Sequence, residues 1–316
     1  MFHEYKKTIE KGDVVMLYMT RESIVPIVVD EEKNFNNKFG EYKHKKMIGM
    51  DYGTKMLSEN KKGFLYLLHP TPELWTLSVP HRTQILYMPD ISIISLKLDL
   101  KPGKIVIESG TGSGSFTHSI ARSIAPSGHL HTFEYHEERA KIIKAELENH
   151  NLASIVTSNH RDVCKNGFSL EDVADAVFLD LPAPWEAVPA AVKSLRKDKV
   201  GRICTFSPCI EQVQRTALAL NENGFFDIET IECLVRTHDS SHLEMPDIQS
   251  AIDGQKAKFK SNKGRKRLIS SKIKNADEDA ETQDISITKL LASKPVMTAR
   301  GHTSYLTFAS LLVNKP

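Results

Sequence analysis

The sequence predicts an α/β fold in which helices cover a parallel β-sheet, with a small β domain ahead of it. The first observation is the apolar run Ile105–Ile107, which is made of β-branched residues and leads into a glycine-rich turn. The second is that two later apolar runs end in an acidic residue, Glu134 and Asp180. Because the carboxyl ends of parallel strands share one edge of a sheet, we expect these residues around one crevice. A chain of 316 residues that is 40% hydrophobic has room for both parts.

The apolar runs, the cysteine content and the net charge of the sequence exclude several classes of protein. No apolar run is long enough to cross a bilayer, and residues 1–7 lack the apolar centre of a signal peptide. The four cysteines have neither the spacing of a metal site nor the density of a disulfide framework, so we expect no metal and a reducing intracellular compartment. The net charge is only +2, so binding to nucleic acid would depend on local basic patches.

Residues 1–68 are expected to form the small β domain, which we predict to be barrel-like. Apolar runs at 14–19, 23–29 and 64–68 predict short strands separated by polar turns. A basic cluster lies between the second and third of these runs, and its members are Lys38, Lys43, His44, Lys45 and Lys46. A solvated turn and a phosphate contact both fit this cluster, and the two interpretations stay open.

Residues 69–100 are expected to connect the two domains. Thr71 followed by Pro72 is typical of a helix start, and a second, amphipathic helix is expected from Pro89 to Leu98. Between these helices, hydrogen-bonding residues favour a loop that closes over the glycine turn and touches a cofactor or a base. They are His81, Arg82, Thr83 and Gln84.

The glycine turn carries Gly110, Gly112 and Gly114, which allow the backbone to bend sharply and to approach a ligand that side chains would block. A dinucleotide fingerprint requires a further glycine where Ser115 stands, so hydride transfer is disfavoured. A helix is expected from Phe116 onward.

Glu134 lies about 20 residues after the last glycine of the turn, where a carboxylate can accept hydrogen bonds from two ribose hydroxyls. The alternative is a solvated glutamate at an ordinary strand end. With the turn and the carboxylate in register, the pattern resembles class I methyltransferases, a Rossmann-like family that binds S-adenosylmethionine. The resemblance implies a seven-stranded sheet in a domain that covers residues 101–316.

The later part of the chain continues the alternation of strands and helices. We expect helices at 137–150 and 210–220 and strands at 155–157, 174–180, 200–206, 225–234 and 304–313. The resemblance places Asp162 against the adenine amine of the cofactor, although a helix cap suits a lone aspartate equally well. Asp180 is the leading catalytic candidate, because the prolines of a loop at 181–186 would hold its carboxylate near the transferable methyl group.

Residues 237–294 are expected to be an insertion. The last two predicted strands are about 70 residues apart, which is far beyond a normal hairpin connection. Nine basic and no acidic residues lie between Lys256 and Lys274, and an acidic run follows, so a largely disordered loop is predicted. Residues 263–267 fit a nuclear localisation signal, a contact to an RNA backbone or a solvating linker.

Five segments together resemble the catalytic subunits of the eukaryotic tRNA (adenine-N1)-methyltransferases. The segments are 69–75, 80–87, 108–115, 180–186 and 207–213. The resemblance implies N1-methylation of the T-loop adenosine at tRNA position 58, S-adenosylmethionine as cofactor and a nuclear location. It also implies a heterotetramer of two catalytic chains and two non-catalytic, paralogous tRNA-binding chains. In one departure from the Asp/Asn-Pro-Pro-aromatic pattern of amine methyltransferases, Leu181 precedes the first proline and Trp185 is the aromatic residue.

Carried over residue by residue, the resemblance assigns catalysis to Asp180. Its expected cofactor-binding residues are Gln84, Ile85, Leu86, Glu108, Ser109, Gly110, Thr111, Gly112, Ser113, Gly114, Ser115, Glu134, Arg139, Asp162, Val163 and Asp180. Its expected substrate-binding residues are His81, Arg82, Thr83, Tyr87, Pro182, Pro184, Trp185, Ser207 and Pro208. It assigns no role to Arg300.

The chemistry of this reaction can be derived from the nucleophile. Adenine N1 carries an in-plane lone pair, so positioning dominates and no strong base is needed. Asp180 would stabilise the positive charge that develops on the base by accepting a hydrogen bond from its exocyclic amine, while Trp185 or Tyr87 could stack on it. Two other classes stay open: a non-catalytic RNA-binding subunit, which the intact glycine turn argues against, and a methyltransferase for proteins or small molecules. The basic segments and the sequence after Asp180 disfavour the latter.

Overall fold

The computed structural model describes residues 2, 4–79, 84–246, 248, 252, 287–296 and 304–312. The chain divides into two units, residues 1–233 with 302–316 and residues 234–301.

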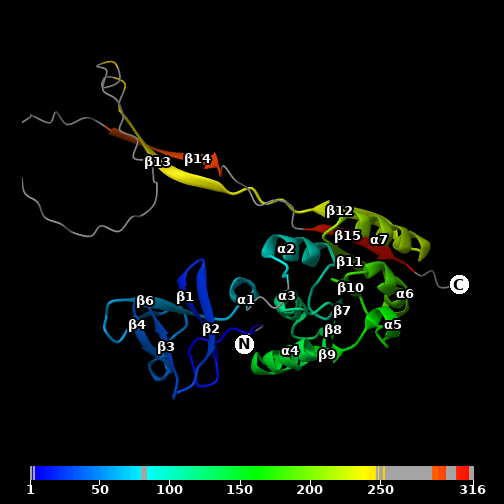
Figure 1. Ribbon diagram of the computed structural model, residues 1–316, viewed down its shortest axis with the longest axis horizontal. Helices are drawn as coiled ribbons and strands as arrows, with labels where there is room; N and C mark the ends of the chain where they lie inside the picture. The colour runs from blue at the N-terminus through cyan, green and yellow to red at the C-terminus, as the bar shows by residue number, and fades with distance from the viewer. Residues whose placement is uncertain are drawn as a thin grey trace, which may run out of the picture. The chain divides into compact units, whose positions relative to one another are not determined.

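A seven-stranded sheet forms the centre of the first unit (Figure 1), and its strand order is β12-β15-β11-β10-β7-β8-β9. The strands from β11 to β9 pair in parallel, whereas β15 pairs antiparallel with β11 on one side and β12 on the other. The predicted seven-stranded sheet is therefore confirmed. The strands are β7 (Ile105–Ser109), β8 (His129–Glu134), β9 (Val156–His160), β10 (Ala176–Leu179), β11 (Gly201–Ser207), β12 (Phe226–Glu232) and β15 (Tyr305–Leu311).

Helices cover both faces of this sheet because successive residues of its strands point to opposite sides. Val106 of β7 packs in one buried core and its neighbour Ile107 in the other. The first core is shared with α1 to α4 and the second with α5 to α7, as the two groups of helices in Figure 1 show. The helices are α1 (Pro72–Ser78), α2 (Met88–Lys97), α3 (Ser115–Ile124), α4 (Glu137–Asn149), α5 (Val163–Asn166), α6 (Pro184–Ser194) and α7 (Ile210–Glu222).

The loop predicted for residues 181–186 is shorter than expected, since Pro184 and Trp185 form the first turn of α6. Proline is favoured at the first helical position, because its missing N–H would have no partner within the helix. The loop that follows β10 therefore ends at Ala183. Thr71 behaves as predicted, because its side chain accepts a hydrogen bond from the backbone N–H of Leu74 (3.3 Å) at the start of α1.

The amino-terminal part of the first unit is rich in β-structure, as predicted. Its four-stranded antiparallel sheet has the order β2-β1-β6-β5, and a separate hairpin consists of β3 and β4. These pairings give an open sheet, and the barrel-like closure expected from the sequence is not among them; the domain boundary at residue 68 stays a prediction. The elements are β1 (Val14–Thr20), β2 (Ser23–Val28), β3 (Asn34–Asn37), β4 (Gly40–Lys43), the 3-10 helix η1 (His44–Lys46), β5 (Lys55–Leu57) and β6 (Phe64–Leu68).

The second unit contains an antiparallel pair, β13 (His238–Pro246) and β14 (Ile287–Pro295). These flanks of the predicted insertion are therefore strands, and the prediction of disorder is wrong for them. Nine consecutive backbone pairs align the two strands, and backbone hydrogen bonding of this kind leaves little trace in a polar sequence. The predictions for Lys256–Lys274 and for residues 263–267 lie outside the described residues, as does Arg300. None of the helices in the described ranges is long and apolar enough to cross a membrane.

Candidate functional site

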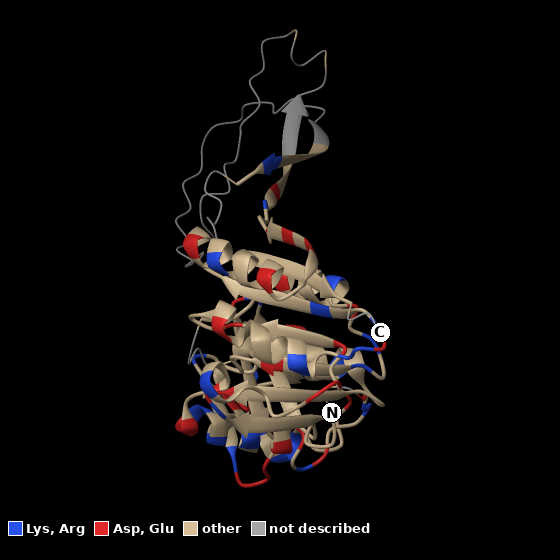
Figure 2. Ribbon diagram, turned by 90° about the vertical axis from the view of Figure 1, so that its right-hand side faces the viewer, with Lys and Arg blue, Asp and Glu red and all other residues tan. Residues whose placement is uncertain are grey.

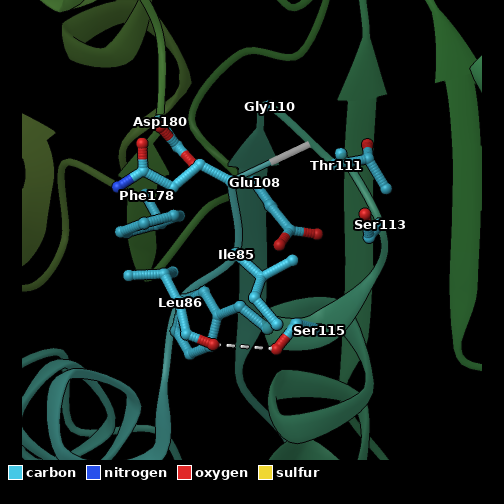
Figure 3. Close-up of a pocket in the computed structure, with 12 residues that line it drawn as sticks. Ile85, Leu86, Glu108, Gly110, Thr111, Ser113, Ser115, Phe178 and Asp180 are labelled. Carbon is cyan, nitrogen blue, oxygen red and sulfur yellow. Dashed lines mark hydrogen bonds between the residues drawn. The ribbon is translucent and has the colours of Figure 1, made fainter. Parts of the chain in front are cut away.

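The turn between β7 and α3 lies directly against the end of β10 (Figure 3). Gly110, Gly112 and Gly114 all have positive φ angles, of 95°, 56° and 75°. A β-carbon on Gly110 would lie 2.1 Å from the carbonyl oxygen of Asp180. The backbone N–H of Asp180 in turn donates to the carbonyl of Ser109 (2.8 Å). Only glycine permits this close approach, which fixes Asp180 beside the turn.

The segment before α2 is tied to the same turn. The hydroxyl of Ser115 donates to the carbonyl of Leu86 (3.0 Å), as the dashed line in Figure 3 shows, and lies 2.9 Å from the hydroxyl of Thr76. Ile85 and Leu86 are buried in the core that contains α3. The described part of the predicted loop, which begins at Gln84, therefore does approach the glycine turn.

Glu134 at the end of β8 is buried and holds the turn from the other side. Its carboxylate accepts hydrogen bonds from the backbone N–H groups of Gly112 (3.0 Å) and His136 (2.9 Å). The guanidinium of Arg139, from the first part of α4, lies 2.7 Å from the same carboxylate. These donors fix the orientation of the Glu134 carboxylate.

Glu108, the residue before Ser109 on β7, is buried beneath the turn. One of its carboxylate oxygens accepts hydrogen bonds from the hydroxyls of Thr117 (2.7 Å) and Thr132 (2.8 Å). Burial raises the pKa of Glu108 to about 7, helped by the negative charges of Asp180 and Glu134 and opposed by the two hydroxyls.

Asp180 keeps part of its surface open, but protein atoms surround its carboxyl group closely. Burial, followed by the negative charge of Glu134, raises the pKa of Asp180 to about 7. Three carboxyl groups, those of Glu108, Glu134 and Asp180, thus converge on one point of the fold. A cluster of this kind attracts a cation.

These residues line a cleft of about 580 Å³ at the carboxyl ends of the strands. The predicted site residues that line it are Gln84, Ser109, Gly110, Gly112, Glu134, Arg139, Asp162, Val163, Asp180, Pro182 and Pro208. A smaller cavity of about 20 Å³ beneath the turn, shown in Figure 3, adds Ile85, Leu86, Glu108, Thr111, Ser113 and Ser115. The structure therefore gathers most of the predicted site in one place.

Several predicted residues are not part of the cleft lining. Trp185 instead lies beneath the guanidinium of Arg215, at 5.3 Å, and Pro184 is buried at the start of α6. Tyr87 is exposed at the start of α2, and Ser207 is buried on β11. Neither ring is in the cleft lining, and the stacking of Trp185 or Tyr87 on a base stays a prediction. Gly114 lies behind the turn, at the start of α3, and residues 80–83 lie outside the described ranges.

The position of Asp162 is compatible with both roles that the sequence left open, a helix cap and a contact to a ligand. Its side chain accepts a hydrogen bond from the backbone N–H of Lys165 (3.3 Å) and so caps α5. The same residue also lines the cleft beside Val163. A ligand in the cleft can therefore reach a side chain that is already held in place.

Gln212 is a cleft residue that the sequence did not reveal. Its side-chain amide donates to the carbonyl of Pro182 (3.0 Å), and its side-chain oxygen accepts from the backbone N–H of Cys209 (3.1 Å). It thereby joins the loop after Asp180 to the start of α7. The three-residue spacing from Cys209 to Gln212 is that of a capping box, which was the available signal. Other cleft residues that were not predicted are Tyr135, His136, Arg161, Cys164, Lys165, Leu181, Ala183, Glu186 and Phe206.

The raised pKa of Asp180 predicts how stability depends on pH. An unfolded aspartate loses its proton near pH 3.8, whereas folded Asp180 keeps its proton until about pH 7, so only the folded state binds this proton between these values. The contribution of Asp180 to the free energy of unfolding should therefore fall, by on the order of 2–4 kcal/mol, as pH rises through this window. Urea denaturation at pH 5 and pH 8 should show a larger fall for the wild type than for Asp180→Asn. Equal falls would contradict the assignment of a raised pKa.

Within the described ranges, no group of three or more His, Cys, Asp and Glu side chains is arranged to hold a metal ion. The polar groups of the cleft include glycine backbone, the carboxylates of Glu134, Asp162 and Asp180, and the side chains of Gln84 and Gln212. These groups suit a ligand that carries hydroxyls and positive charge.

Comparison with known proteins agrees with this geometry. A family model described as the tRNA methyltransferase complex GCD14 subunit matches residues 63–311. The chain is 44% identical to the tRNA (adenine(58)-N(1))-methyltransferase catalytic subunit TRM61 of Candida albicans, with 98% of each chain covered. It is 43% identical to the corresponding catalytic subunit of Dictyostelium discoideum, again over 98% of both chains.

Solved structures show the same fold. A SAM-dependent O-methyltransferase from Thermotoga maritima superposes with a TM-score of 0.72 at 26% identity, covering 98% of this chain and 97% of that one. The tRNA (m1A58) methyltransferase TrmI from Aquifex aeolicus superposes with a TM-score of 0.64 at 24% identity, covering 96% and 98%. The sheet and its two layers of helices are therefore the Rossmann-like fold of S-adenosylmethionine-dependent methyltransferases, as predicted. Because the family model covers most of the chain and the curated relatives cover nearly all of it, this chain belongs to the family of the GCD14 subunit of the tRNA methyltransferase complex.

Proposed function

We propose that this chain is the catalytic subunit of a tRNA (adenine(58)-N(1))-methyltransferase that uses S-adenosylmethionine. The observation that carries the proposal is the placement of Glu134, the glycine turn and Asp180 around one cleft. Relatives with 43% and 44% identity over nearly the whole chain are named as catalytic subunits of this enzyme.

The residues of the cleft fit this cofactor. Glu134 is a fixed acceptor for ribose hydroxyls, and Asp162 is a second carboxylate on the same side of the cleft. The glycine turn presents backbone without side chains to the cleft at Gly110 and Gly112, and the three carboxyl groups favour a positively charged ligand. When bound, S-adenosylmethionine supplies a methyl group on a sulfonium.

Asp180 would act on the base. Adenine N1 needs no general base, so the protein has to hold the ring in line with the methyl group. The carboxylate of Asp180 would accept a hydrogen bond from the exocyclic amine and stabilise the positive charge as it develops on the ring. Its open surface on the cleft and its backbone bond to Ser109 support this role.

The partner and the location are part of the same proposal. The family is described as a subunit of a tRNA methyltransferase complex, which supports assembly with another chain. We propose a heterotetramer of two catalytic and two non-catalytic, paralogous tRNA-binding chains in the nucleus. The small net charge of +2 supports the need for a second tRNA-binding chain, because one nearly neutral subunit holds a large polyanion weakly.

The test is methyl transfer from labelled S-adenosylmethionine to unmodified tRNA, with the full-length chain alone and together with the paralogous subunit. The modified nucleoside should be N1-methyladenosine at position 58, and turnover should rise when the partner is present. Cofactor binding without transfer to any RNA in the assembled complex would contradict the proposed function.

Replacing Glu134 with glutamine should weaken cofactor binding by roughly 30- to 100-fold, or about 2–3 kcal/mol. A side-chain amide would turn one acceptor oxygen into a donor that faces the N–H of Gly112 or of His136, and would end the ion pair with Arg139. Calorimetry with S-adenosylmethionine measures the change. Glu137→Gln is the matched control, because Glu137 is exposed and pairs only with Lys141 at 2.8 Å among the ion pairs of the described residues. Equal affinities for the two variants would contradict the role of Glu134.

A further inference from the structure

Two hairpin tips of the β domain are in direct contact. The first is Lys38–Phe39, between β3 and β4, and the second is the turn 58–63 between β5 and β6. The backbone N–H of Glu59 donates to the carbonyl of Glu41 (2.9 Å), and a β-carbon on Gly63 would lie 2.3 Å from the β-carbon of Phe39. The two tips therefore form one continuous surface.

Hydrogen bonds within each tip fix its backbone. In the second tip, the hydroxyl of Ser58 accepts from the N–H of Gly63 (3.0 Å), and the side-chain oxygen of Asn60 accepts from the N–H of Lys62 (2.9 Å). In the first, the side chain of Asn37 accepts from the N–H of Phe39 (2.8 Å). A surface held in this way loses little conformational entropy when a ligand binds.

Basic side chains gather on this surface without acidic partners. Lys38, Lys61 and Lys62 stand on the tips and Lys55 on β5, and none of the four makes an ion pair within the ranges that the structure describes. The nearby acid Glu59 is already paired with Lys46 at 2.8 Å and lies 4.0 Å from Lys43. The basic cluster predicted from the sequence is thus divided: His44 is buried, Lys43 and Lys46 lie near Glu59, and Lys38 stands on a tip.

Exposed aromatic rings accompany these lysines. Phe64 is 47% and Phe39 is 45% exposed. The ammonium group of Lys55 lies 3.9 Å from the ring centre of Phe64, and that of Lys38 lies 5.0 Å from the ring centre of Phe39. Tyr66 follows on the same outward face of β6, with its ring centre 5.8 Å from that of Phe64.

The core of the β domain does not need these outward rings. It is built from the alternate residues of the same strands, Met56, Leu65 and Leu67, which are buried. Phe64, Tyr66 and Lys55 therefore leave apolar surface in contact with water, which is unfavourable, and they add nothing to the core. We call the group Lys38, Phe39, Lys55, Lys61, Lys62, Phe64 and Tyr66 the tip patch.

Unpaired lysines beside exposed rings match the chemistry of RNA. Lysine binds phosphate as a point charge, and a ring beside it offers a stacking surface for an unpaired base. An acidic protein partner is less well matched, since lysine is depleted at the centres of protein interfaces. On the side of the molecule drawn in Figure 2, basic and acidic segments are interspersed along the coloured helices and loops.

We infer that the tip patch is a contact site for the tRNA substrate, in which lysines bind backbone phosphates and Phe64 stacks on an unpaired base or a ribose face. This inference rests on the proposed function, because it names the RNA-binding surface of the proposed enzyme. It assigns to the β domain a part in substrate affinity and none in the chemical step.

The first test is charge reversal in the full-length chain assembled with its partner subunit. Lys38→Glu/Lys62→Glu should weaken binding of unmodified tRNA by about 10- to 100-fold at moderate salt and reduce the slope of log affinity against log salt by about 2. Lys197→Glu/Lys199→Glu is the matched control, since both lysines are exposed and lie just before β11, at the end of the sheet away from the cleft. The control should change tRNA affinity by less than about twofold, because salt screens exposed charges that lie far from the bound RNA.

The second test separates stacking from charge. Phe64→Leu keeps an apolar side chain but removes the ring, and should weaken tRNA binding by at least about fivefold with an unchanged salt slope. All variants should keep the wild-type affinity for S-adenosylmethionine and the wild-type kcat, with a raised KM for tRNA as the only kinetic change.

The outcomes separate the tip patch from the proposed function. If the wild-type complex methylates tRNA while the Lys38/Lys62 variant binds tRNA like the control, the tip patch is refuted and the enzyme stands. If that variant instead loses its partner subunit on purification and keeps its tRNA affinity, the patch is a protein interface and the inference is overturned. If the wild-type complex neither binds nor methylates tRNA, both proposals fail.

Discussion

Replacing Gly110 with alanine should abolish measurable cofactor binding and lower the free energy of unfolding by more than about 3 kcal/mol. The new β-carbon would lie 2.1 Å from the carbonyl oxygen of Asp180 and 3.0 Å from its carbonyl carbon. Neither backbone can retreat easily, since Asp180 donates to Ser109 and Gly110 donates to Phe133 (2.9 Å). Calorimetry and thermal unfolding measure the two effects.

Gly53→Ala is the matched control for this substitution. Gly53 has a φ of 90°, close to the 95° of Gly110, but a β-carbon there would meet no atom within 4 Å. The strain of a left-handed conformation should therefore cost Gly53→Ala only about 1 kcal/mol and leave cofactor affinity unchanged. If the two variants lost stability equally, the close approach of the turn to β10 would not be the reason that Gly110 is a glycine.

Replacing Asp180 with asparagine should reduce kcat for methyl transfer by about 100- to 1,000-fold while cofactor affinity changes by less than about threefold. The amide has nearly the same shape as the carboxyl group but cannot carry the charge that stabilises a cationic base. Single-turnover transfer to tRNA with saturating cofactor measures the chemical step, and calorimetry measures the affinity.

The control for this variant is Asp198→Asn, which removes an exposed carboxylate that pairs with Arg196 at 2.7 Å. Its turnover should match the wild type. Near-normal turnover of Asp180→Asn would remove Asp180 from the chemical step, whereas a large loss of cofactor affinity would assign Asp180 to the cofactor instead.

Much of the fold could be predicted because apolar periodicity records which faces of a strand or helix are buried. Val106 and Ile107 already showed a strand that is covered on both sides, and the positions of Ala140, Ile143 and Leu147 predicted the core face of α4. Helix α6 was hidden by Pro184 and Pro189, because proline usually marks a loop and becomes compatible with a helix only at particular positions. The pairing of β13 with β14 depends on backbone hydrogen bonds, which polar residues do not reveal.

The site was predictable where a residue ends a strand. Glu134 is the last residue of β8 and Asp180 directly follows β10, so sheet geometry alone brings them to the cleft. The directions of the Trp185 and Tyr87 side chains depend on the rotation of α6 about its axis and on the course of the chain before α2. The sequence does not determine either. Gln212 reaches the loop at Pro182 from 30 positions away, so its role depends on how two elements pack.

The position of β15 has a consequence for synthesis on the ribosome. β15 is the last of the seven strands to be made, yet it lies between β11 and β12, and 72 residues separate Glu232 from Tyr305. At 5–20 residues per second, roughly 4 to 14 s pass between completion of β12 and arrival of β15. During this interval the nascent chain presents unpaired strand edges, which are prone to aggregate and are natural targets for chaperones. A stop codon within the intervening segment would yield a product that keeps every residue of the cleft but lacks the strand that joins β12 to the sheet.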